Sequence, residues 1–505
     1  MSGITRPRNL LAGLALGLLT LLVLFTSHDR YRQKSFTELR IAVVEHTPYH
    51  DEVIGGVLAA LYEAEADYDL YRDRLHRGFD EILSDVYPDS PIRLDELVPA
   101  LDEGKYDVLV IVTGDEKFWG GRDDLLDAMR RSTSTHIICL VHEIEIYGNQ
   151  KDLAMIAPFA EQERLTLLTL GQHSARTLKT KLSRWAWERG EPMWENVDVV
   201  HFAPVFKIPA SAKLETPVIE CSNTPEDGPP SRVAILGRIH QSNRDYEGIF
   251  RDLVIALTAD PKPWGYDSVP YTAEQLASLP ELALETSAPT HRFVPLEHAD
   301  PPAFTLHLIG EDLGLVAIPF ELTDAEHPIV RIHSNIEYRE FYDILGAMDL
   351  ILPAFSTFTY LDARSSASIP AAVIARTKVL ASPALLNSYT YLSPPAYVLA
   401  PLSVSEISSI ALLRQGRDPW LGTFPQALEK EIDVMSAGWV GVSASSSASW
   451  FGNRARASAS NWENYERRLA KKNREVWRDM LSRTRGNNGL DSKIEQAIEV
   501  MKVDE

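Results

Sequence analysis

Cysteine is almost absent from the chain, with two residues among 505. Cys139 lies inside the apolar run Ile137–Val141, a context typical of a buried thiol rather than of a bridge. A disulfide between Cys139 and Cys221 is therefore not expected. Disulfides are not predicted to hold this fold, and so low a count leaves the cellular compartment open.

An excess of positive charge is also missing. The chain has 50 Lys and Arg against 71 Asp and Glu, which gives a formal net charge of −21. A general nucleic-acid-binding protein needs a basic stripe to neutralise phosphates, and none of that extent is visible. This class of function is excluded, whereas a local site for an anion is compatible with the composition.

Several well-known catalytic and metal-binding motifs do not occur. The sequence has no HExxH or Cys-His metal spacing, no Gly-x-Ser-x-Gly elbow and no Walker loop. One Asp-x-Asp match, Asp67-Tyr68-Asp69, follows a predicted helix in a polar, acidic stretch, so we interpret it as a solvated surface. No bound metal is expected.

A long uncharged segment stands near the start of the chain. Residues 10–26 carry no charge, and as a helix they would span roughly 26 Å, enough for a thin bilayer. We predict a transmembrane signal anchor there, after a short tail (1–9) and before a stem (27–39). The alternative is a cleaved signal peptide that begins with Arg6 and Arg8, although the end of the run lacks a small-x-small cleavage site.

Orientation in the membrane does not follow from charge. Arg6 and Arg8 before the segment are balanced by Arg30, Arg32 and Lys34 after it. The absence of any permitted Asn-x-Ser/Thr acceptor allows a cytosolic face. A basic tail, an anchor, a stem and then a catalytic domain is nevertheless the usual layout of Golgi transferases, so we expect a Golgi or ER protein with a luminal catalytic part.

The rest of the chain predicts two α/β domains. A chain of this length exceeds one ordinary core, and continuous apolar runs alternating with amphipathic stretches indicate parallel sheets covered on both faces. We predict a Rossmann-like domain over 40–215, a Pro- and Gly-bearing linker over 216–230 and a second Rossmann-like domain over 231–430. A helical segment over 431–505 follows.

Individual elements follow from the same patterns. Strands are predicted at 40–45, 107–112, 136–141, 165–168, 197–202, 233–236, 304–309, 330–333, 350–352 and 379–381. Helices are predicted at 50–62, 122–131, 173–187, 245–257, 337–348 and 368–375. The Pro-bearing stretch 260–302 is predicted to be an insertion or surface loop. At 461–485 we expect an amphipathic helix packed against the body, because acidic residues interrupt the basic ones that could otherwise bind a membrane.

One post-strand loop is suited to binding a diphosphate. In parallel sheets, ligands bind at the carboxyl ends of strands, and Gly237, Arg238 and Arg244 directly follow the strand at 233–236. Glycine allows a close backbone approach, a helix start favours an anion, and two guanidinium groups can clamp a diphosphate. The alternative is that either arginine pairs with surface carboxylates.

These residues also carry a family resemblance. Gly237-Arg238 with Arg244-Asp245-Tyr246 resembles the start of the C-terminal domain in retaining GT-B glycosyltransferases of the glycogen synthase and group-1 type. Leu306 to Gly310 resembles that family's next strand and Gly loop, Tyr338 to Pro353 its helix and strand, and Tyr360 to Ala381 its donor-site region. The likeness covers most of 232–400 and is that of a divergent, fungal-like, membrane-anchored branch.

The sequence departs from this family at one point. Many members carry two glutamates separated by seven residues, whereas this chain has Asp362 and Pro370 at that spacing. The carboxylate that would hold the donor ribose is therefore missing. By resemblance, Asp362, Ser365, Ser366 and Ser368 would then contact the donor, with Gly237, Gly310 and the two arginines.

In the first domain, two post-strand loops resemble the acceptor-facing loops of the same fold. They contain His50 and His142, and either imidazole could position an acceptor hydroxyl. The alternative for each is a loop histidine bonded to a neighbouring carboxylate. His173, after the strand at 165–168, is a weaker candidate that is expected to belong to a helix cap.

The resemblance implies a retaining hexosyltransferase that moves a sugar from a nucleoside-diphosphate sugar to a glycan, lipid or protein acceptor. The sugar nucleotide would be a co-substrate, and no cofactor or metal is expected. One alternative is a non-catalytic, membrane-anchored binding protein that retains the fold, which the missing carboxylate favours. The other is a sugar-nucleotide epimerase, which would bind the donor without an acceptor.

Overall fold

The computed structural model describes residues 39–47, 50–114, 122–145, 150–214, 216–219, 229–277, 291–420 and 459–502. The predicted anchor at 10–26, its flanking segments and Cys221 lie outside these residues. Within the described part, no helix combines the length and the apolar character that a membrane crossing requires.

The first sheet is parallel and has six strands in the order β2-β1-β3-β4-β5-β6. Its strands are short and mostly buried, as the apolar runs predict. They are β1 (Arg40–Val44), β2 (Asp67–Tyr71), β3 (Val108–Ile111), β4 (His136–Leu140), β5 (Leu165–Thr169) and β6 (Asp198–His201). The helices are α2 (Asp51–Glu63), α3 (Phe79–Leu83), α4 (Leu97–Asp102), α6 (Asp123–Arg131), α7 (Gln150–Glu161) and α8 (Gln172–Arg189).

The second sheet is also parallel and six-stranded, in the order β11-β10-β7-β12-β13-β14. Its strands are β7 (Arg232–Leu236), β10 (Thr305–Ile309), β11 (Val330–His333), β12 (Leu350–Leu352), β13 (Lys378–Ala381) and β14 (Tyr397–Leu399). The helices are α9 (Tyr246–Ala259), α12 (Tyr338–Gly346), α13 (Thr359–Asp362), α14 (Ser368–Ile374), α15 (Pro383–Ser388) and α16 (Glu406–Arg414). The prediction of two Rossmann-like sheets is confirmed.

Two segments differ from expectation. Asp67-Tyr68-Asp69, predicted as a solvated acidic surface, begins the edge strand β2, where Lys105 Nζ lies 2.8 Å from Asp69 Oδ2. The strand was missed because a polar start is common on edge strands. The stretch 260–302, predicted as an insertion or surface loop, contains the antiparallel pair β8 (Tyr266–Pro270) and β9 (His291–Pro295). The short helix α10 (Ala273–Ala277) follows β8, and residues 278–290, between α10 and β9, lie outside the described residues.

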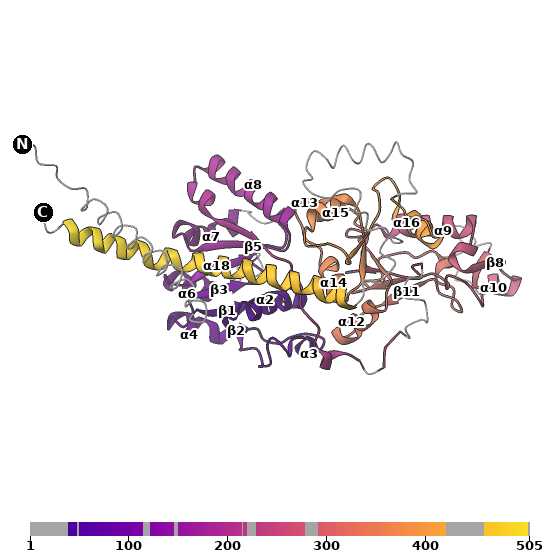
Figure 1. The fold of residues 1–505 in the computed structure, drawn as a ribbon, viewed down its shortest axis with the longest axis horizontal. Helices are drawn as coiled ribbons and strands as arrows, with labels where there is room; N and C mark the ends of the chain where they lie inside the picture. Colours follow the sequence, from indigo (N-terminus) through magenta and orange to yellow (C-terminus); the bar gives the residue numbers. More distant parts are fainter. Residues whose placement is uncertain are drawn as a thin grey trace, which may run out of the picture.

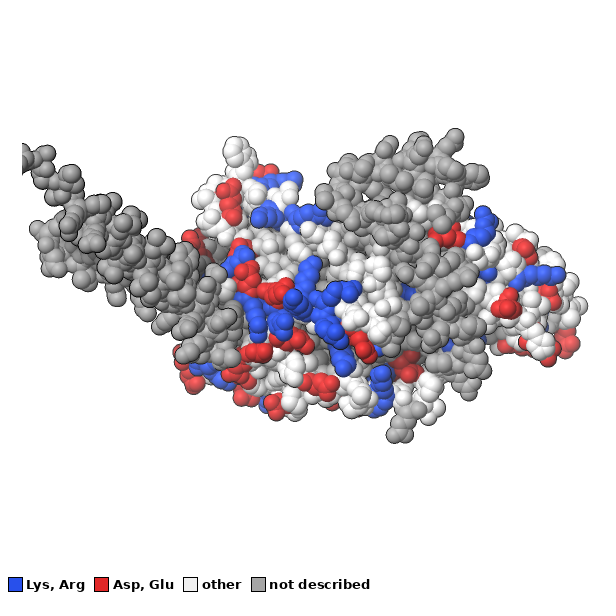
Figure 2. Space-filling model, viewed as in Figure 1, with Lys and Arg blue, Asp and Glu red and all other residues white. Residues whose placement is uncertain are grey.

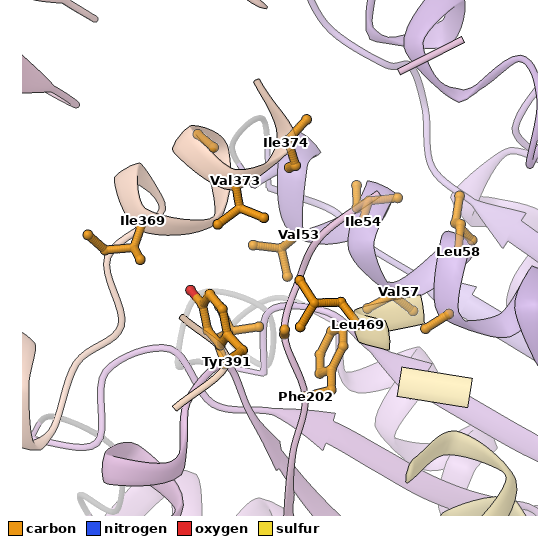
Figure 3. Packing of buried hydrophobic residues seen from close by; sticks show 14 of the residues in the cluster. Val53, Ile54, Val57, Leu58, Phe202, Ile369, Val373, Ile374, Tyr391 and Leu469 are labelled. Atoms are coloured by element: carbon orange, nitrogen blue, oxygen red, sulfur yellow. The ribbon is translucent and has the colours of Figure 1, made fainter. Parts of the chain in front are cut away.

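One apolar cluster spans the two sheets, and two further clusters each belong mainly to one of them. Val53 of α2 packs against α14 residues such as Val373, and Val57 of α2 lies beside Leu469 (Figure 3). Helix α2 belongs to the first sheet and α14 to the second. The predicted domains are therefore joined by buried apolar surface, whose removal from water stabilises their contact.

The last described helix, α18 (Ala459–Lys502), connects both halves (Figure 1). Tyr465 Oη donates to Tyr391 O at 2.9 Å in the second half, and Asn473 bonds both the backbone N and O of Ala203 in the first. Trp477 is fully buried. The prediction that this helix packs on the body is confirmed, and Lys and Arg gather on the visible face where it runs (Figure 2).

Candidate functional site

The carboxyl ends of the two sheets face each other across the boundary between the halves. On one flank, the loops after the edge strands β2 and β11 meet. Arg77 Nη2 donates to Asn335 Oδ1 at 3.0 Å, and the backbone N of Tyr338 donates to Arg77 O at 3.0 Å. These bonds hold the two sheets together at this side.

On the other flank, loops after β4 and β5 meet the connection between β12 and β13. Arg364 Nη2 lies 3.1 Å from Glu143 Oε2 and 3.3 Å from Glu145 Oε2. The backbone N of Ile144 donates to Ala363 O at 3.3 Å. The contacts thus form a second polar seam across the boundary.

His173, expected near a helix cap, also belongs to this second seam. It lies in the first turn of α8, and its side chain is buried. Nδ1 lies 2.8 Å from Ser388 O and Nε2 lies 3.0 Å from Arg364 O, both across the boundary. Burial lowers the pKa of His173, while these two backbone carbonyls raise it. The geometry makes His173 a structural contact between the halves.

Between the two flanks lie the ends of the central strands. The strand orders place β1 and β3 between the contacts of the first sheet, and β10 and β7 between those of the second. The direction of strand succession reverses between β1 and β3 and between β7 and β12, and such switch points are where parallel α/β sheets bind ligands. The candidate site therefore lies where both switch points face the boundary.

Gly237 and Gly310 line the second sheet's side of this site. They follow β7 and β10, which are neighbours in the sheet, and both have positive φ, +113° and +154°. A β-carbon on Gly310 would lie 1.9 Å from Gly237 O. Only glycine fits at position 310, and its lack of a side chain lets the two loops approach each other closely.

Arg238 is the exposed cation of this loop. Its side chain is 48% exposed, and Nε donates to Glu311 Oε2 at 2.9 Å. An exposed pair of this kind contributes about 0–1 kcal/mol, so exchanging Glu311 for an incoming anion costs little. The side chain pairs with a surface carboxylate, which is the alternative stated for it from the sequence, and it stands in the loop directly after β7.

Arg244 has a different environment and is buried. Nε and Nη2 donate to Leu236 O at 3.2 and 3.0 Å, and Nη1 donates to Asn243 O at 3.1 Å. Nη2 also lies 3.1 Å from Ser366 Oγ and 3.4 Å from Ser368 Oγ. The guanidinium group thus joins the end of β7 to the start of α14 and acts as a positioning residue in this structure.

The remaining predicted donor residues lie along the same connection. Ser366 and Ser368 are buried and bonded to each other at 2.7 Å. Ser365 Oγ is 3.2 Å from Ser174 Oγ, and Asp362 Oδ1 accepts from Thr177 Oγ1 at 3.0 Å, both on α8. Ser366 and Ser368 therefore contact Arg244, whereas Ser365 and Asp362 contact helix α8 of the first half. Their contact with a donor stays a prediction.

Glu406 is a carboxyl group near Arg244 that the sequence did not single out. Its Oε1 accepts from the backbone N of Ala354, at 3.0 Å, in the loop after β12. Burial raises the pKa of Glu406 to about 7, although the Ala354 bond and the charge of Arg244 act in the opposite direction. A protonatable group therefore lies next to the switch point of the second sheet.

On the first sheet's side, the structure brings the two predicted histidines together. The ring centroids of His50 and His142 lie 4.1 Å apart, and His142 Nε2 is 2.8 Å from Val112 O. Burial, followed by the neighbouring His142 and Arg72, lowers the pKa of His50 well below its ordinary value. His50 is therefore neutral at pH 7, the form in which an imidazole can accept a proton.

Glu45 is a site residue that the sequence reasoning missed. It directly follows β1, is buried, and accepts bonds from Thr47 N at 2.7 Å and Thr47 Oγ1 at 2.8 Å. Thr113 Oγ1, after β3, donates to its other oxygen, so Glu45 bridges the switch point. Burial raises its pKa. A charged residue at the end of an apolar strand was the available signal.

Two further acidic groups lie beside this cluster. Asp51 Oδ1 is 2.8 Å from Arg72 Nη2, with both side chains buried, and burial raises the pKa of Asp51 to about 7. Burial also raises the pKa of Glu52, which is hydrogen bonded to Tyr338 of the second half. No group of three or more metal-binding side chains occurs among the residues that the structure describes.

Comparison with known proteins gives a weak structural likeness. No family model matches the chain. No curated protein sequence matches it either.

Solved structures match at low similarity. Anabaena Alr3699/HepE in complex with UDP and glucose has 9% identity and a TM-score of 0.40, covering 79% of this chain and all of that one. An alpha,alpha-trehalose 6-phosphate synthase from Burkholderia multivorans has 10% identity and a TM-score of 0.40, and the match covers 89% of this chain and 98% of that one. UDP-N-acetylglucosamine 2-epimerase from Rickettsia bellii has 10% identity and a TM-score of 0.38, and the match covers 89% of this chain and 98% of that one. Likeness at this level does not bear on function, so the function is inferred from the geometry of the site.

Proposed function

We propose that the chain is a glycosyltransferase of GT-B type that uses a nucleoside-diphosphate sugar. The observation that carries this proposal is that the two sheets turn their switch points toward each other, and that polar side chains stand at the strand ends of each. A fold of two such sheets suits a reaction between two substrates, because each sheet can bind one of them.

The second sheet supplies groups suited to the donor. Gly237 and Gly310 allow close approach of a diphosphate to the backbone, and Arg238 at the same loop end is exposed. When the bond between sugar and diphosphate breaks, negative charge grows on the leaving diphosphate. Arg238 would stabilise that charge after leaving Glu311, since a guanidinium group binds phosphate oxygens in pairs.

The first sheet supplies groups suited to the acceptor. His50 and His142 are in ring contact, and Glu45 connects the loop after β1, which leads to His50, with the loop after β3. A neutral imidazole can take the proton of an acceptor hydroxyl, and this is the role we assign to His50 or His142. We further propose that transfer retains the anomeric configuration, which product analysis by NMR would test.

The first experiment measures nucleotide binding. Titration of UDP and GDP into the full chain by calorimetry should show binding of at least one of them. Arg238→Gln should weaken it about tenfold or more, because one charge-assisted contact is lost. Arg251→Gln is the matched control, since Arg251 lies on α9, is 65% exposed and pairs with Asp252. Equal affinity of Arg238→Gln and wild type would remove the proposed role of Arg238, and no binding of any nucleotide would remove the proposal.

A second candidate is a binding protein that no longer transfers sugar. The observation in its favour is that Arg244, Ser366 and Ser368 bond one another inside the protein. Nucleotide binding without consumption of any sugar nucleotide, with or without acceptors, would support it. Interconversion of a sugar nucleotide in the absence of acceptor would instead identify an epimerase.

We also propose attachment to a Golgi or ER membrane through 10–26, with the folded part in the lumen. The support is the uncharged run itself and the stem that follows it. Protease protection of the folded part in sealed microsomes is the expected result. Digestion without detergent would place it on the cytosolic side.

A further inference from the structure

A cavity lies in the half built on the second sheet, away from the candidate site. It has a volume of about 250 Å³. Arg232 and Thr305, which begin β7 and β10, line it, so it lies toward the amino ends of these strands. The candidate site is at their carboxyl ends. Ile219, between the two sheets in sequence, and Tyr266, on β8, close its sides.

The polar lining of this cavity includes two arginines, two histidines and one carboxylate. Arg232, Arg331, His307 and His327 contribute to it, together with the hydroxyl groups of Ser231 and Thr305. Within the described residues Arg331 is in no ion pair. In a chain with a net charge of −21, a guanidinium group that lines a hollow without a carboxylate partner is suited to an anionic ligand.

The carboxylates nearby are already engaged. Glu326 is the lining carboxylate, and its Oε2 lies 2.5 Å from Arg292 Nη2. Asp324 is also paired with Arg292, at 3.2 Å. Asp349, below the start of β7, accepts from the backbone N of Ser231 and of Arg232 at 2.7 and 2.9 Å. Arg331 is thus left facing the hollow with its charge available.

A buried polar chain forms one wall of the cavity. His307 is buried and links Thr305 Oγ1, 3.0 Å from Nε2, to His333 Nε2, 2.9 Å from Nδ1. Burial is the largest cause, and together with the neighbouring His333, Arg331 and Arg232 it lowers the pKa of His307 to about 3. The wall is therefore neutral and polar, and it lies in a positive field that favours an anion.

We propose that this cavity binds a small phosphate-bearing dianion, either inorganic phosphate or a phosphomonoester. Arg331 holds the phosphate oxygens, and the hydroxyl groups of Thr305 and Ser231 contribute hydrogen bonds. The volume accommodates a phosphate group with a small substituent. Because the site is at the opposite end of β7 and β10 from Gly237 and Gly310, it is separate from the proposed donor site.

The test titrates inorganic phosphate and glycerol phosphate into the full chain by calorimetry at constant ionic strength, with sodium chloride as blank. Wild type should bind at least one of them, and Arg331→Gln should weaken that binding about tenfold. Arg184→Gln, at an exposed arginine of α8, is the matched control and should bind like wild type. Binding of phosphate but not of the ester identifies free phosphate as the ligand, and tighter binding of the ester identifies a phosphomonoester.

Two outcomes overturn the proposal. One is equal binding by wild type and Arg331→Gln, or no binding above the chloride blank. The other is loss of phosphate binding when UDP is present at saturating concentration, because phosphate would then occupy the nucleotide site. Nucleotide binding itself should be unchanged in Arg331→Gln, so failure of this proposal is distinguishable from failure of the glycosyltransferase proposal.

Discussion

Gly310 and Gly237 lie so close that a β-carbon on Gly310 would meet Gly237 O at 1.9 Å. They are joined through the sheet, since the backbone N of Gly237 donates to Ile309 O at 3.0 Å. The loop carrying Arg238 is thus held against the loop carrying Glu311 by backbone contact rather than by side chains. This close pairing fixes where the guanidinium group of Arg238 stands.

Gly310→Ala is therefore expected to destabilise the protein. The added methyl group forces the two loops apart and also requires a side chain at φ +154°, which together cost about 3 kcal/mol or more. The measurement is the thermal unfolding midpoint, which should fall by roughly 6 °C or more for a domain of this size.

Gly314→Ala is the matched control for Gly310→Ala. Gly314 also has positive φ, +67°, but a β-carbon there meets nothing within 4 Å. Its cost should be only the backbone term, about 1 kcal/mol. Equal midpoints for the two variants would show that the close approach of the loops does not matter for stability.

The strands and helices of this fold could largely be predicted, because buried parallel strands are continuous apolar runs. Val233 to Leu236 is an example, predicted and observed almost to the residue. β2 could not be found in this way, since only Leu70 and Tyr71 of its five residues are fully buried. Edge strands lose the pattern on which the prediction depends.

The site could be predicted only as a set of loops. Arg238 and Arg244 follow the same strand and are chemically identical, yet one is exposed and the other buried. The difference arises because the chain next to Arg244 contacts the loop after β12, where Asp245 N donates to Ala354 O at 2.8 Å. Such a tertiary bond between distant segments leaves no local pattern in the sequence. The pairing of His50 with His142 is hidden in the same way.

Arg244 is expected to contribute to stability much more than Arg238. Arg244→Gln leaves the carbonyls of Leu236 and Asn243 without their charged donor, which we expect to cost about 3 kcal/mol in the free energy of unfolding. Arg238→Gln removes only an exposed ion pair and should cost less than about 1 kcal/mol. Urea unfolding of both variants gives the comparison.

Arg244→Lys separates the positioning role of Arg244 from direct contact with a donor. Lysine keeps the charge but lacks the planar fork whose Nη1 and Nη2 reach Asn243 O and Leu236 O together. A positioning residue should therefore lose stability in this variant. Unchanged stability with weaker UDP binding would instead show that Arg244 contacts the diphosphate, as the sequence analysis proposed.

Glu406 should make stability depend on pH. Burial raises its pKa to about 7 in the folded protein, against 4.5 for an ordinary glutamate, so the folded state holds a proton that the unfolded state has lost between these values. The stability from this group is fully present below pH 4.5 and is lost as pH rises toward 7. Above pH 7 the contribution is constant.

Glu406→Gln removes this titration and keeps the oxygen that accepts from Ala354 N. The variant should gain stability relative to wild type as pH rises from about 4.5 to 7, by up to about 3 kcal/mol, less where water screens the carboxylate. Urea unfolding at pH 5, 6, 7 and 8 measures this difference, with Glu247→Gln on the exposed first turn of α9 as control. A difference between Glu406→Gln and wild type that stays flat across the range would mean that Glu406 is ionised throughout. Arg244 would then have a permanent counter-charge, and the balance of charge around the proposed donor loop would be less positive than inferred.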